Sequence, residues 1–229
     1  MLSSVSNNRS VLVCIEGLDG AGKTVQANLL ADYLRQRGNS ILMVDFPQYD
    51  SFFGTEIGAY LSGRNVVDAN QLDVKSMSLW YAMDRWNNLK KVDLTQFNFV
   101  IFNRFTLSNA VYQGARTPAI FRADMIKWIF DLEHTQLSLP VPDLYIFLDV
   151  PIDISNKLND QKGERNYIGN NSDVYEKDLT LQENVRTIYF QMAKELQNID
   201  IISCIEHGVL LSPKAISIKV LQSLQAFLQ

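Results

Sequence analysis

A glycine-rich segment near the N-terminus has the residue types and the spacing to bind phosphate. Gly17-Leu-Asp-Gly-Ala-Gly22-Lys23-Thr24 fits the pattern G-x-x-x-x-G-K-[ST]. In this pattern the glycines let backbone N–H groups turn inward around the phosphates of a nucleotide. The lysine reaches the β- and γ-phosphates, and the threonine hydroxyl helps to hold Mg²⁺. The predicted nucleotide-binding residues are therefore Gly17, Gly20, Ala21, Gly22, Lys23, Thr24 and Val25.

The sequence around this segment supports that interpretation. The segment follows an apolar run, Val11–Ile15, and opens a helical pattern, Lys23–Arg37, as a phosphate-binding loop requires. The alternative is a glycine-rich turn with a solvent-exposed lysine, and it does not account for this order. A guanine-reading N-K-x-D motif is missing from the sequence, because the nearest match, Asn156-Lys157-Leu158-Asn159, ends in an amide. The segment thus predicts nucleotide binding but does not specify a reaction.

The elements that must position this loop alternate between short apolar runs and longer helical patterns, which is typical of parallel βαβ units. The runs are apolar on successive residues, as expected of strands that are covered on both faces. We predict strands at Val11–Ile15, Ile41–Phe46, Phe99–Phe102, Leu144–Val150 and Ile199–Ile205. We predict helices at Lys23–Arg37, Leu72–Lys91, Arg122–Gln136, Tyr175–Leu196 and Ala215–Leu228.

The net charge, the cysteines and the lengths of the apolar runs indicate which classes of protein this sequence does not fit. The net charge of −4 argues against a nucleic-acid binder, because such domains usually have a basic surplus. Cys14 and Cys204 lie in apolar runs and fit buried reduced thiols better than a disulfide framework. No apolar run approaches the roughly 20 residues that span a bilayer, and Met1–Ser10 lacks the apolar core of a signal peptide. We expect a cytoplasmic protein with one domain, 11–229, after a flexible tail, 1–10.

One stretch departs from the alternating pattern. Asp160–Asp173 is rich in glycine, asparagine and charge, and has almost nothing to bury. Loops of this length without structure are often lids that close over a site, so we predict a lid at about 157–173.

Five further groups of residues occur in a fixed order along the chain. They are Glu16-Gly17-Leu18-Asp19-Gly20, Phe46-Pro47-Gln48-Tyr49, Tyr81-Ala82-Met83-Asp84-Arg85-Trp86, Asn103-Arg104-Phe105 with Ser108-Asn109-Ala110-Val111-Tyr112, and Asp173-Val174-Tyr175-Glu176. In this order they resemble motifs of the thymidylate kinase family: E-G-x-D-G, the F-P segment, the helix that holds the base, D-R-[YF] with its following segment, and the acidic motif after the lid. The resemblance extends from about Val11 to the end of the chain.

The resemblance implies a fold, a reaction and partners. The implied fold is α/β: a three-layer P-loop kinase fold whose five-stranded parallel sheet has the order 2-3-1-4-5, with helices on both faces and a short lid. The implied reaction is ATP-dependent phosphorylation of dTMP to dTDP, with Mg²⁺ as cofactor, in a homodimer. Two alternatives stay open: a kinase for another deoxynucleotide or for a nucleoside, and a nucleotide-binding relative with lost or reduced catalysis.

The resemblance also assigns the base site. Tyr81 and Arg85 lie four residues apart and therefore share one helix face. By resemblance the aromatic ring stacks on thymine and the guanidinium donates to its carbonyl oxygen. The alternative is a core tyrosine and a solvated arginine. By resemblance, Asn109 pairs with the base edge and Tyr112 crowds a ribose 2′-OH.

Arg104 directly follows the predicted strand Phe99–Phe102. Ligands gather at the carboxyl ends of parallel strands, and a fork of donors suits an acceptor phosphate. The alternative is an ordinary surface ion pair. The predicted substrate-binding residues are eleven in all. They are Phe46, Pro47, Tyr49, Tyr81, Arg85, Arg104, Ser108, Asn109, Tyr112, Tyr175 and Glu176.

The remaining assignments concern charge around the transferred group. By resemblance, Asp19 and Glu176 lie near Mg²⁺, together with Thr24 of the glycine-rich loop, although an acidic residue at Glu176 also complements a helix dipole. Lys157, Lys162 and Arg165 fit the arrangement in which the lid carries the catalytic cations, and Arg165 is the predicted contact to the phosphoryl group. The predicted catalytic residues are Lys23, Arg104, Arg165 and Asp19.

Two positions depart from the family motifs. Asn103 stands where the family usually has an aspartate, and Gln48-Tyr49 stands where many relatives have an arginine. An amide lacks the negative charge of the aspartate, and this difference motivates the alternative of lost catalysis.

Overall fold

The computed structural model of the protein describes residues 9–65, 67–160 and 174–228. Lys162, Arg165 and most of the predicted lid and tail therefore lie outside the described residues.

The Ser10 hydroxyl oxygen lies 2.5 Å from the Leu94 carbonyl oxygen and 2.7 Å from that of Phe97, and Ser10 is 6% exposed. The packed domain thus includes Ser10, which the sequence placed in the tail.

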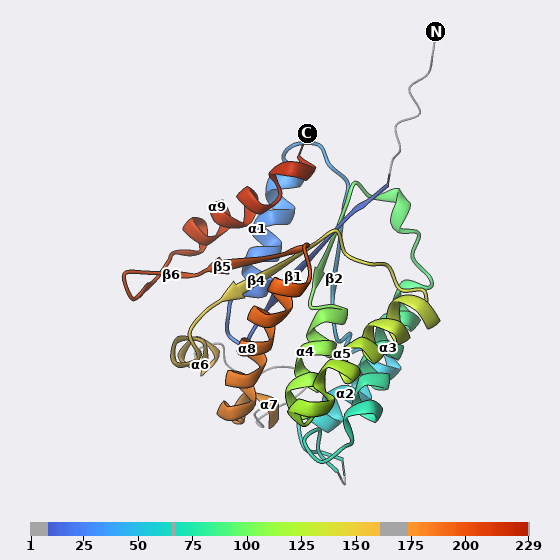
Figure 1. The fold of residues 1–229 in the computed structure, drawn as a ribbon. Coiled ribbons are helices and arrows are strands. Elements are labelled where there is room, and N and C mark those ends of the chain that lie inside the picture. The colour runs from blue at the N-terminus through green and yellow to red at the C-terminus, as the bar shows by residue number, and fades with distance from the viewer. Residues whose placement is uncertain (1–8, 66, 161–173, 229) are drawn as a thin grey trace.

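Five parallel strands form the central sheet, in the predicted order β2-β3-β1-β4-β5 (Figure 1). Asn103 is in register with Ile15 of β1 on one side and with Asp45 of β2 on the other. The carboxyl ends of these three strands therefore meet at one edge of the sheet. The strands are β1 (Val11–Gly17), β2 (Ile41–Asp45), β3 (Phe99–Asn103), β4 (Leu144–Asp149) and β5 (Ile199–Ser203).

Helices cover both faces of the sheet, which confirms the three-layer prediction. Val13 and Ile15 of β1 point into a core shared with α1 (Lys23–Arg35) and α9 (Pro213–Ser223). Leu12 and Cys14 belong to the core on the opposite face, against α4 (Thr106–Arg116) and α8 (Leu179–Glu195). Successive side chains of a strand point to opposite faces of the sheet, so β1 contributes apolar side chains to the cores on both faces. In Figure 1, α2 (Phe52–Leu61), α3 (Val74–Leu89) and α5 (Arg122–Phe130) lie on the α4 side.

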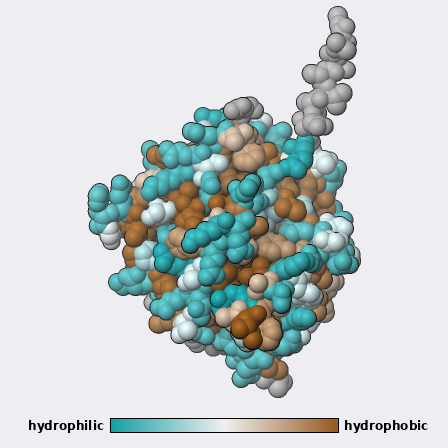
Figure 2. Space-filling model, in the orientation of Figure 1, coloured by the Kyte–Doolittle hydropathy of each residue, from teal (hydrophilic) through white to brown (hydrophobic). Residues whose placement is uncertain are grey.

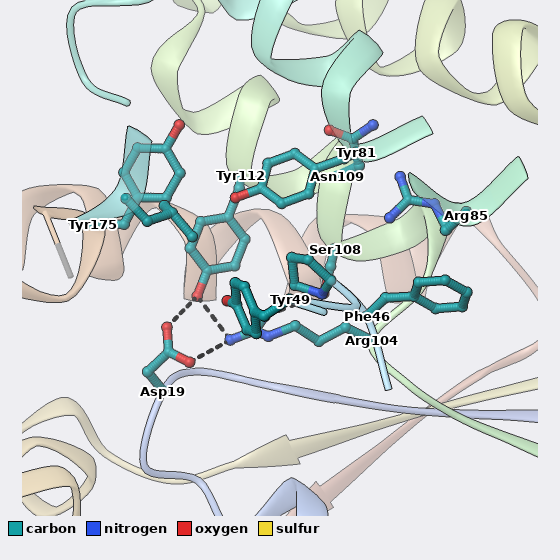
Figure 3. Close-up of a pocket in the computed structure, with 12 residues that line it drawn as sticks. Asp19, Phe46, Tyr49, Tyr81, Arg85, Arg104, Ser108, Asn109, Tyr112 and Tyr175 are labelled. Atoms are coloured by element: carbon teal, nitrogen blue, oxygen red, sulfur yellow. Dashed lines mark hydrogen bonds and ion pairs between the residues drawn. The ribbon is translucent and has the colours of Figure 1, made fainter. Parts of the chain in front are cut away.

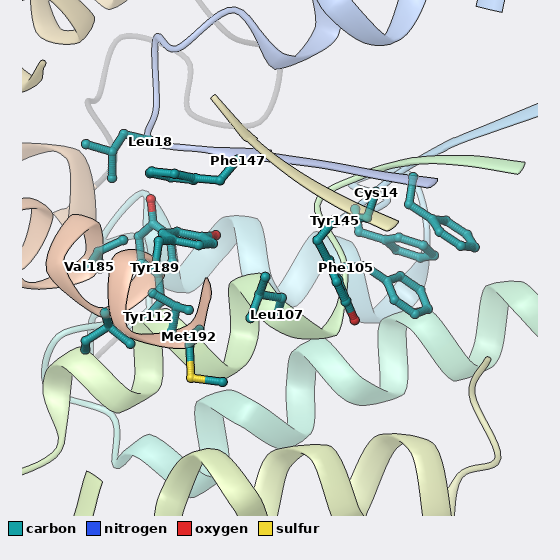
Figure 4. Packing of buried hydrophobic residues seen from close by; sticks show 14 of the residues in the cluster. Cys14, Leu18, Phe105, Leu107, Tyr112, Tyr145, Phe147, Val185, Tyr189 and Met192 are labelled. Atoms are coloured by element: carbon teal, nitrogen blue, oxygen red, sulfur yellow. The ribbon is translucent and has the colours of Figure 1, made fainter. Parts of the chain in front are cut away.

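Aromatic side chains fill the core beneath α4 and α8 (Figure 4). The rings of Phe147 and Tyr189 stack with centroids 4.2 Å apart, and those of Phe102 and Phe105 with centroids 4.3 Å apart. Burying a side chain of this size contributes about 1.5–3 kcal/mol. This layer fixes the position of α4 relative to the sheet.

Two predicted helices differ in the structure. The segment Arg122–Gln136 is α-helical only to Phe130 and continues as a π-helix over Asp131–Gln136. The segment Tyr175–Leu196 is two helices, α7 (Val174–Lys177) and α8, because Asp178 leaves the helical conformation and its carboxylate accepts the Leu181 N–H at 2.9 Å. A single long helix was therefore the wrong prediction.

Several elements were not predicted. Most of α4 is buried and its sequence is rich in Thr, Ser, Asn and Gly, which have poor helix propensity. The short α2 contains two glycines, and Ser51 caps it by accepting the Gly54 N–H at 3.0 Å. Ile205 belongs to the hairpin of β6 (Ile205–Glu206) and β7 (Val209–Leu210), not to β5. Residues 157–160, the start of the predicted lid, belong to α6 (Ile152–Asp160).

The surface is mixed in character. On the face seen in Figure 2, hydrophilic side chains are interspersed with small apolar areas. Among the described residues, every helix is too short or too polar to cross a bilayer.

Gly54 of α2 allows a close approach of the loop that follows β2. A Cβ atom on this residue would lie 1.8 Å from the Gln48 carbonyl oxygen and 2.9 Å from the Tyr49 nitrogen. We expect Gly54→Ala to displace this loop and to lower the free energy of unfolding by about 1–3 kcal/mol. Thermal melting of the variant tests this. The matched control is Glu56→Ala, two positions further along α2, where we expect less than about 1 kcal/mol; equal losses would contradict the steric explanation.

Candidate active site

The glycine-rich loop connects β1 to α1 as predicted. Gly20 and Gly22 both have φ +84°, a left-handed conformation that favours glycine. Gly22 precedes α1 and makes no side-chain cap, so the N-terminal end of the helix faces the loop without a capping side chain. Lys23 is 9% exposed, and its Nζ donates to the carbonyl oxygens of Gly17 at 3.1 Å and Leu18 at 2.8 Å. These are the features of an anion-binding loop.

A pocket lies directly over this loop, and we call it the loop pocket. It contains four of the predicted nucleotide-binding residues, whereas Gly17, Ala21 and Val25 do not line it. Gly17 and Ala21 are buried beneath the loop, and Val25 is 43% exposed. The lining residues are Asp19, Gly20, Gly22, Lys23, Thr24, Asp45, Phe46, Pro47, Tyr49, Asn103 and Arg104.

A second pocket adjoins the first, and we call it the aromatic pocket (Figure 3). The two pockets share Asp19, Phe46, Pro47, Tyr49 and Arg104, so they form one continuous depression at the carboxyl edge of the sheet. Of the lining residues, only Leu61 was not predicted. They are Asp19, Phe46, Pro47, Tyr49, Leu61, Tyr81, Arg85, Arg104, Ser108, Asn109, Tyr112 and Tyr175.

Arg104 lies where the pockets meet. Its Nη2 donates to Asp19 Oδ1 at 2.7 Å, and its Nη1 donates to Ser108 Oγ at 3.2 Å. The Tyr112 hydroxyl lies 3.4 Å from the other Asp19 oxygen, as the dashed lines of Figure 3 show. Arg104 has φ +65°, which is an unusual conformation for a residue with a Cβ atom and is most often found at functional sites.

Asn103 projects into the loop pocket beside Thr24. Its Nδ2 donates to Thr24 Oγ1 at 3.1 Å. Its Oδ1 is buried and has no hydrogen-bond partner among the described residues. Asp45, the register partner of Asn103 on β2, lines the same pocket and was not predicted. The ends of β2 and β3 and the first turn of α1 thus bring together a carboxylate, an amide oxygen and a hydroxyl.

Glu16 is a fully buried carboxylate beneath the two pockets. It accepts hydrogen bonds from the Phe105 N–H at 3.1 Å, from Tyr189 OH at 2.9 Å and from Ser108 Oγ. Burial and the neighbouring Glu16 carboxylate together raise the pKa of the Cys14 thiol well above its ordinary value. Glu16 therefore anchors the start of α4 to β1.

Asp84 holds the loop that carries Phe46, Pro47 and Tyr49. It is 1% exposed and accepts the Gln48 N–H at 2.9 Å and the Ser51 hydroxyl at 2.8 Å. Burial raises the pKa of this carboxyl group despite these bonds.

Arg85 is not the solvated arginine that the sequence left open as an alternative. It is 2% exposed and donates to Glu133 Oε2 at 2.6 Å and Oε1 at 2.5 Å. Burial of the guanidinium acts to lower its pKa, but the charge and hydrogen bonds of Glu133 outweigh that effect and raise it. Arg85 also lines the aromatic pocket, which places it between the pocket and the core.

Glu16, Asp84 and Glu133 were not predicted. Only Glu16 has a signal in the sequence: it directly follows the apolar run Val11–Ile15, and a carboxylate buried at the end of such a run requires partners.

Two predicted site residues lie wholly or partly outside the described residues. The Glu176 backbone belongs to α7, but its side chain lies outside the described part of the structure, as does all of Arg165. Tyr175 of α7 is described: its ring stacks on Tyr112 with centroids 6.0 Å apart, and its hydroxyl donates to the Ala69 carbonyl oxygen at 3.2 Å.

A phosphate-binding loop continuous with an aromatic pocket, at the carboxyl edge of a parallel sheet, is characteristic of P-loop phosphotransferases. The family model for thymidylate kinase matches residues 15–207. The chain belongs to the thymidylate kinase family.

Individual relatives agree with this assignment. The chain is 30% identical to a protein named probable thymidylate kinase from Pyrococcus abyssi, over 85% of this chain and 88% of that protein. It is 29% identical to the thymidylate kinase of Mycobacterium tuberculosis, over 81% of this chain and 86% of that protein. The structure of the Candida albicans thymidylate kinase shares the fold, with a TM-score of 0.72 at 21% identity, and the match covers 95% of this chain and 92% of that one.

Proposed function

We propose that this chain transfers the γ-phosphoryl group of ATP to the phosphate of dTMP, forming ADP and dTDP. The observation that carries this proposal is the continuity of the loop pocket and the aromatic pocket through Asp19 and Arg104. The donor binds with its phosphates on the glycine-rich loop. The acceptor binds with its base in the aromatic pocket and its phosphate at Arg104.

In this arrangement the reaction is a direct displacement. An oxygen of the acceptor phosphate forms a bond to the γ-phosphorus, and the bond from that phosphorus to the β-phosphate oxygen breaks. Lys23, the N-terminal N–H groups of α1 and Arg104 neutralise the charge on the transferring group. These groups act by aligning the two nucleotides, and the reaction needs no covalent intermediate with the protein.

Mg²⁺ fits the residues of the loop pocket. Among the described residues there is no cluster of three or more Asp, Glu, His or Cys side chains of the kind that holds a metal by itself. Mg²⁺ is usually held by one or two carboxylates together with substrate phosphates, and when bound it neutralises phosphate charge. We assign this role to Thr24 and Asp19, and the unpartnered Oδ1 of Asn103 is a further acceptor for a metal-bound water.

The base site favours thymine. Both Nδ2 hydrogens of Asn109 are used, toward Ser78 O at 3.2 Å and Glu133 Oε1 at 2.8 Å, so only its Oδ1 can accept from a ligand. Arg85 retains its Nη1 hydrogens as donors. A donor beside an acceptor complements the O4 and N3–H of thymine, and we assign Tyr81 to stack on the ring.

We assign Tyr112 to the exclusion of a ribose 2′-OH. Its ring is 6% exposed and held between Tyr175 and the Arg104–Asp19 pair. We also propose that the protein is a homodimer, which light scattering after size-exclusion chromatography would test.

Steady-state ADP release across an acceptor panel tests the proposed function. With ATP and Mg²⁺, we expect dTMP to have the highest kcat/KM among dTMP, dUMP, dCMP, dGMP, UMP and thymidine. A higher value for another acceptor, or no turnover with any of them, would overturn the proposal.

Asn103→Asp tests whether the amide limits catalysis. The aspartate would add negative charge beside Asp45, which attracts a metal but repels the phosphates. Because these effects oppose each other and Lys23 and Arg104 remain, we expect turnover to change by less than about tenfold, or roughly 1.4 kcal/mol of barrier. Both proteins are compared across a Mg²⁺ titration, and a hundredfold gain would mean that the native chain has lost catalysis.

A further inference from the structure

Glu133 is a buried carboxylate that accepts hydrogen bonds from two side chains of the aromatic pocket, Arg85 and Asn109, and from Thr106 behind them. It lies in the π-helix that follows α5, is 0% exposed and does not line the pocket. Its Oε1 accepts from Arg85 Nη2 and Asn109 Nδ2, and its Oε2 accepts from Arg85 Nε and Thr106 Oγ1. Each carboxylate oxygen thus accepts two hydrogen bonds, and the acceptor capacity of the group is filled.

This carboxylate determines which end of the Asn109 amide faces the ligand. The Nδ2 group lies between two acceptors, Glu133 Oε1 at 2.8 Å and the Ser78 carbonyl oxygen at 3.2 Å. A flipped amide would place Oδ1 against both oxygens, and the repulsion would be strong because one of them carries a negative charge. Oδ1 therefore stays on the side of the pocket, where it is buried and has no partner among the described residues.

The same carboxylate determines which hydrogens of Arg85 remain for a ligand. Glu133 takes the Nε and Nη2 donors, and this directs the Nη1 end of the guanidinium away from the carboxylate. Figure 3 shows the Arg85 guanidinium and the Asn109 amide at the same end of the pocket, next to Tyr81. One buried charge thus fixes a donor and an acceptor side by side.

We propose that Glu133 is a positioning residue that sets the base specificity of the acceptor site, by fixing its donor and acceptor pattern through Arg85 and Asn109. The proposal rests on the proposed function. A pyrimidine with a 4-carbonyl group and an N3–H matches this pattern, because its carbonyl accepts from Arg85 and its N3–H donates to Asn109. Cytosine has the reverse pattern, with an amino donor at position 4 and an acceptor at N3. A neutral side chain at position 133 removes the charge that holds the pattern, so discrimination between these bases falls.

Glu133→Gln is the direct test, with kcat and KM measured for dTMP, dUMP, dCMP and ATP. We expect the ratio of kcat/KM for dTMP over dCMP to fall about tenfold or more, chiefly through KM for dTMP. The ratio for dTMP over dUMP should stay within about threefold, because these bases share the edge that Glu133 controls and differ in a methyl group. The KM for ATP should stay within about twofold.

Two further variants separate positioning from general stability. Thr106→Val removes a donor to the opposite oxygen of the same carboxylate and should leave the dTMP over dCMP ratio within about twofold. In an Asn109→Ala background, Glu133→Gln should change that ratio by clearly less than it does in the native background, because one of the two side chains through which it acts is gone. Equal losses for all nucleotides, or full additivity with Asn109→Ala, would overturn the proposal.

Loss of the Glu133 charge leaves Arg85 buried without its partner, so thermal melting must accompany the kinetics. If Glu133→Gln does not melt cooperatively, Glu133→Asp replaces it as the test. This variant keeps the charge but withdraws the carboxylate from Asn109, and a fall of about threefold in the dTMP over dCMP ratio supports the proposal. An unchanged ratio overturns it. Failure of the proposed function itself would be seen separately, in native protein that does not phosphorylate dTMP.

Discussion

Lys23→Ala is expected to reduce kcat by about a thousandfold or more while the fold is retained. Lys23 is the cation of the glycine-rich loop, and in the structure its Nζ is held by two carbonyl oxygens of that loop and lies 3.7 Å from Asp19 Oδ1. From this position we expect it to contact the β- and γ-phosphates of ATP and to compensate the charge that develops on them during the transfer. Alanine leaves that charge without its nearest compensating cation.

ADP release at saturating nucleotides measures this effect, and circular dichroism with thermal melting monitors the fold. Lys90→Ala is the matched control, because Lys90 is exposed and lies over the Trp86 ring, away from both pockets. Its turnover should equal that of the native protein. A well-folded Lys23→Ala protein with turnover within tenfold of native would contradict the assignment of the loop.

Arg104→Ala is expected to lower kcat/KM for dTMP by about a hundredfold or more, which corresponds to ~3 kcal/mol. The substitution removes the guanidinium that we assign to the acceptor phosphate. It also leaves the Asp19 carboxylate, which Arg104 contacts at 2.7 Å, without this partner in the pocket that the phosphate must enter. Both effects weaken acceptor binding more than donor binding.

The measurement is the pair of KM values for dTMP and ATP together with kcat. Arg104→Lys keeps the charge but loses the fork of donors, so its activity should fall between those of native and alanine proteins. Arg35→Ala, at an exposed position on α1, is the control for loss of an arginine. If Arg104→Ala raised both KM values equally, Arg104 would support the structure of the site and would not bind the acceptor.

The parts of the site that depend on local spacing could be predicted from the sequence. The glycine-rich loop is defined by consecutive residues, and the sheet order followed from a family resemblance that covers most of the chain. The position of Arg104 also followed, because the residue after a parallel strand lies at the ligand-binding edge.

The contacts that depend on distant partners could not be predicted. The partner of Arg85 is Glu133, 48 residues further along the chain, in a segment that continues the helical pattern of Arg122–Gln136. Nothing in that pattern distinguishes a carboxylate that faces the core from one that faces water. The interruption of the predicted helix at Asp178 could not be predicted for a different reason. An aspartate that caps the start of a helix looks like an ordinary polar position when it lies within a continuous helical pattern.

The ion pair between Asp19 and Arg104 has a consequence for how the two nucleotides bind. The Asp19 carboxylate is already paired with the Arg104 guanidinium that we assign to the acceptor phosphate. We therefore expect the phosphate of dTMP to replace this carboxylate when it binds. We expect the released Asp19 carboxylate to face the Mg²⁺ ion of the bound donor, in the role assigned to it above. Each ligand therefore relieves a competition that opposes the other, and we expect positive heterotropic cooperativity. Because such coupling is reciprocal, ATP must tighten dTMP binding by the same factor as dTMP tightens ATP binding.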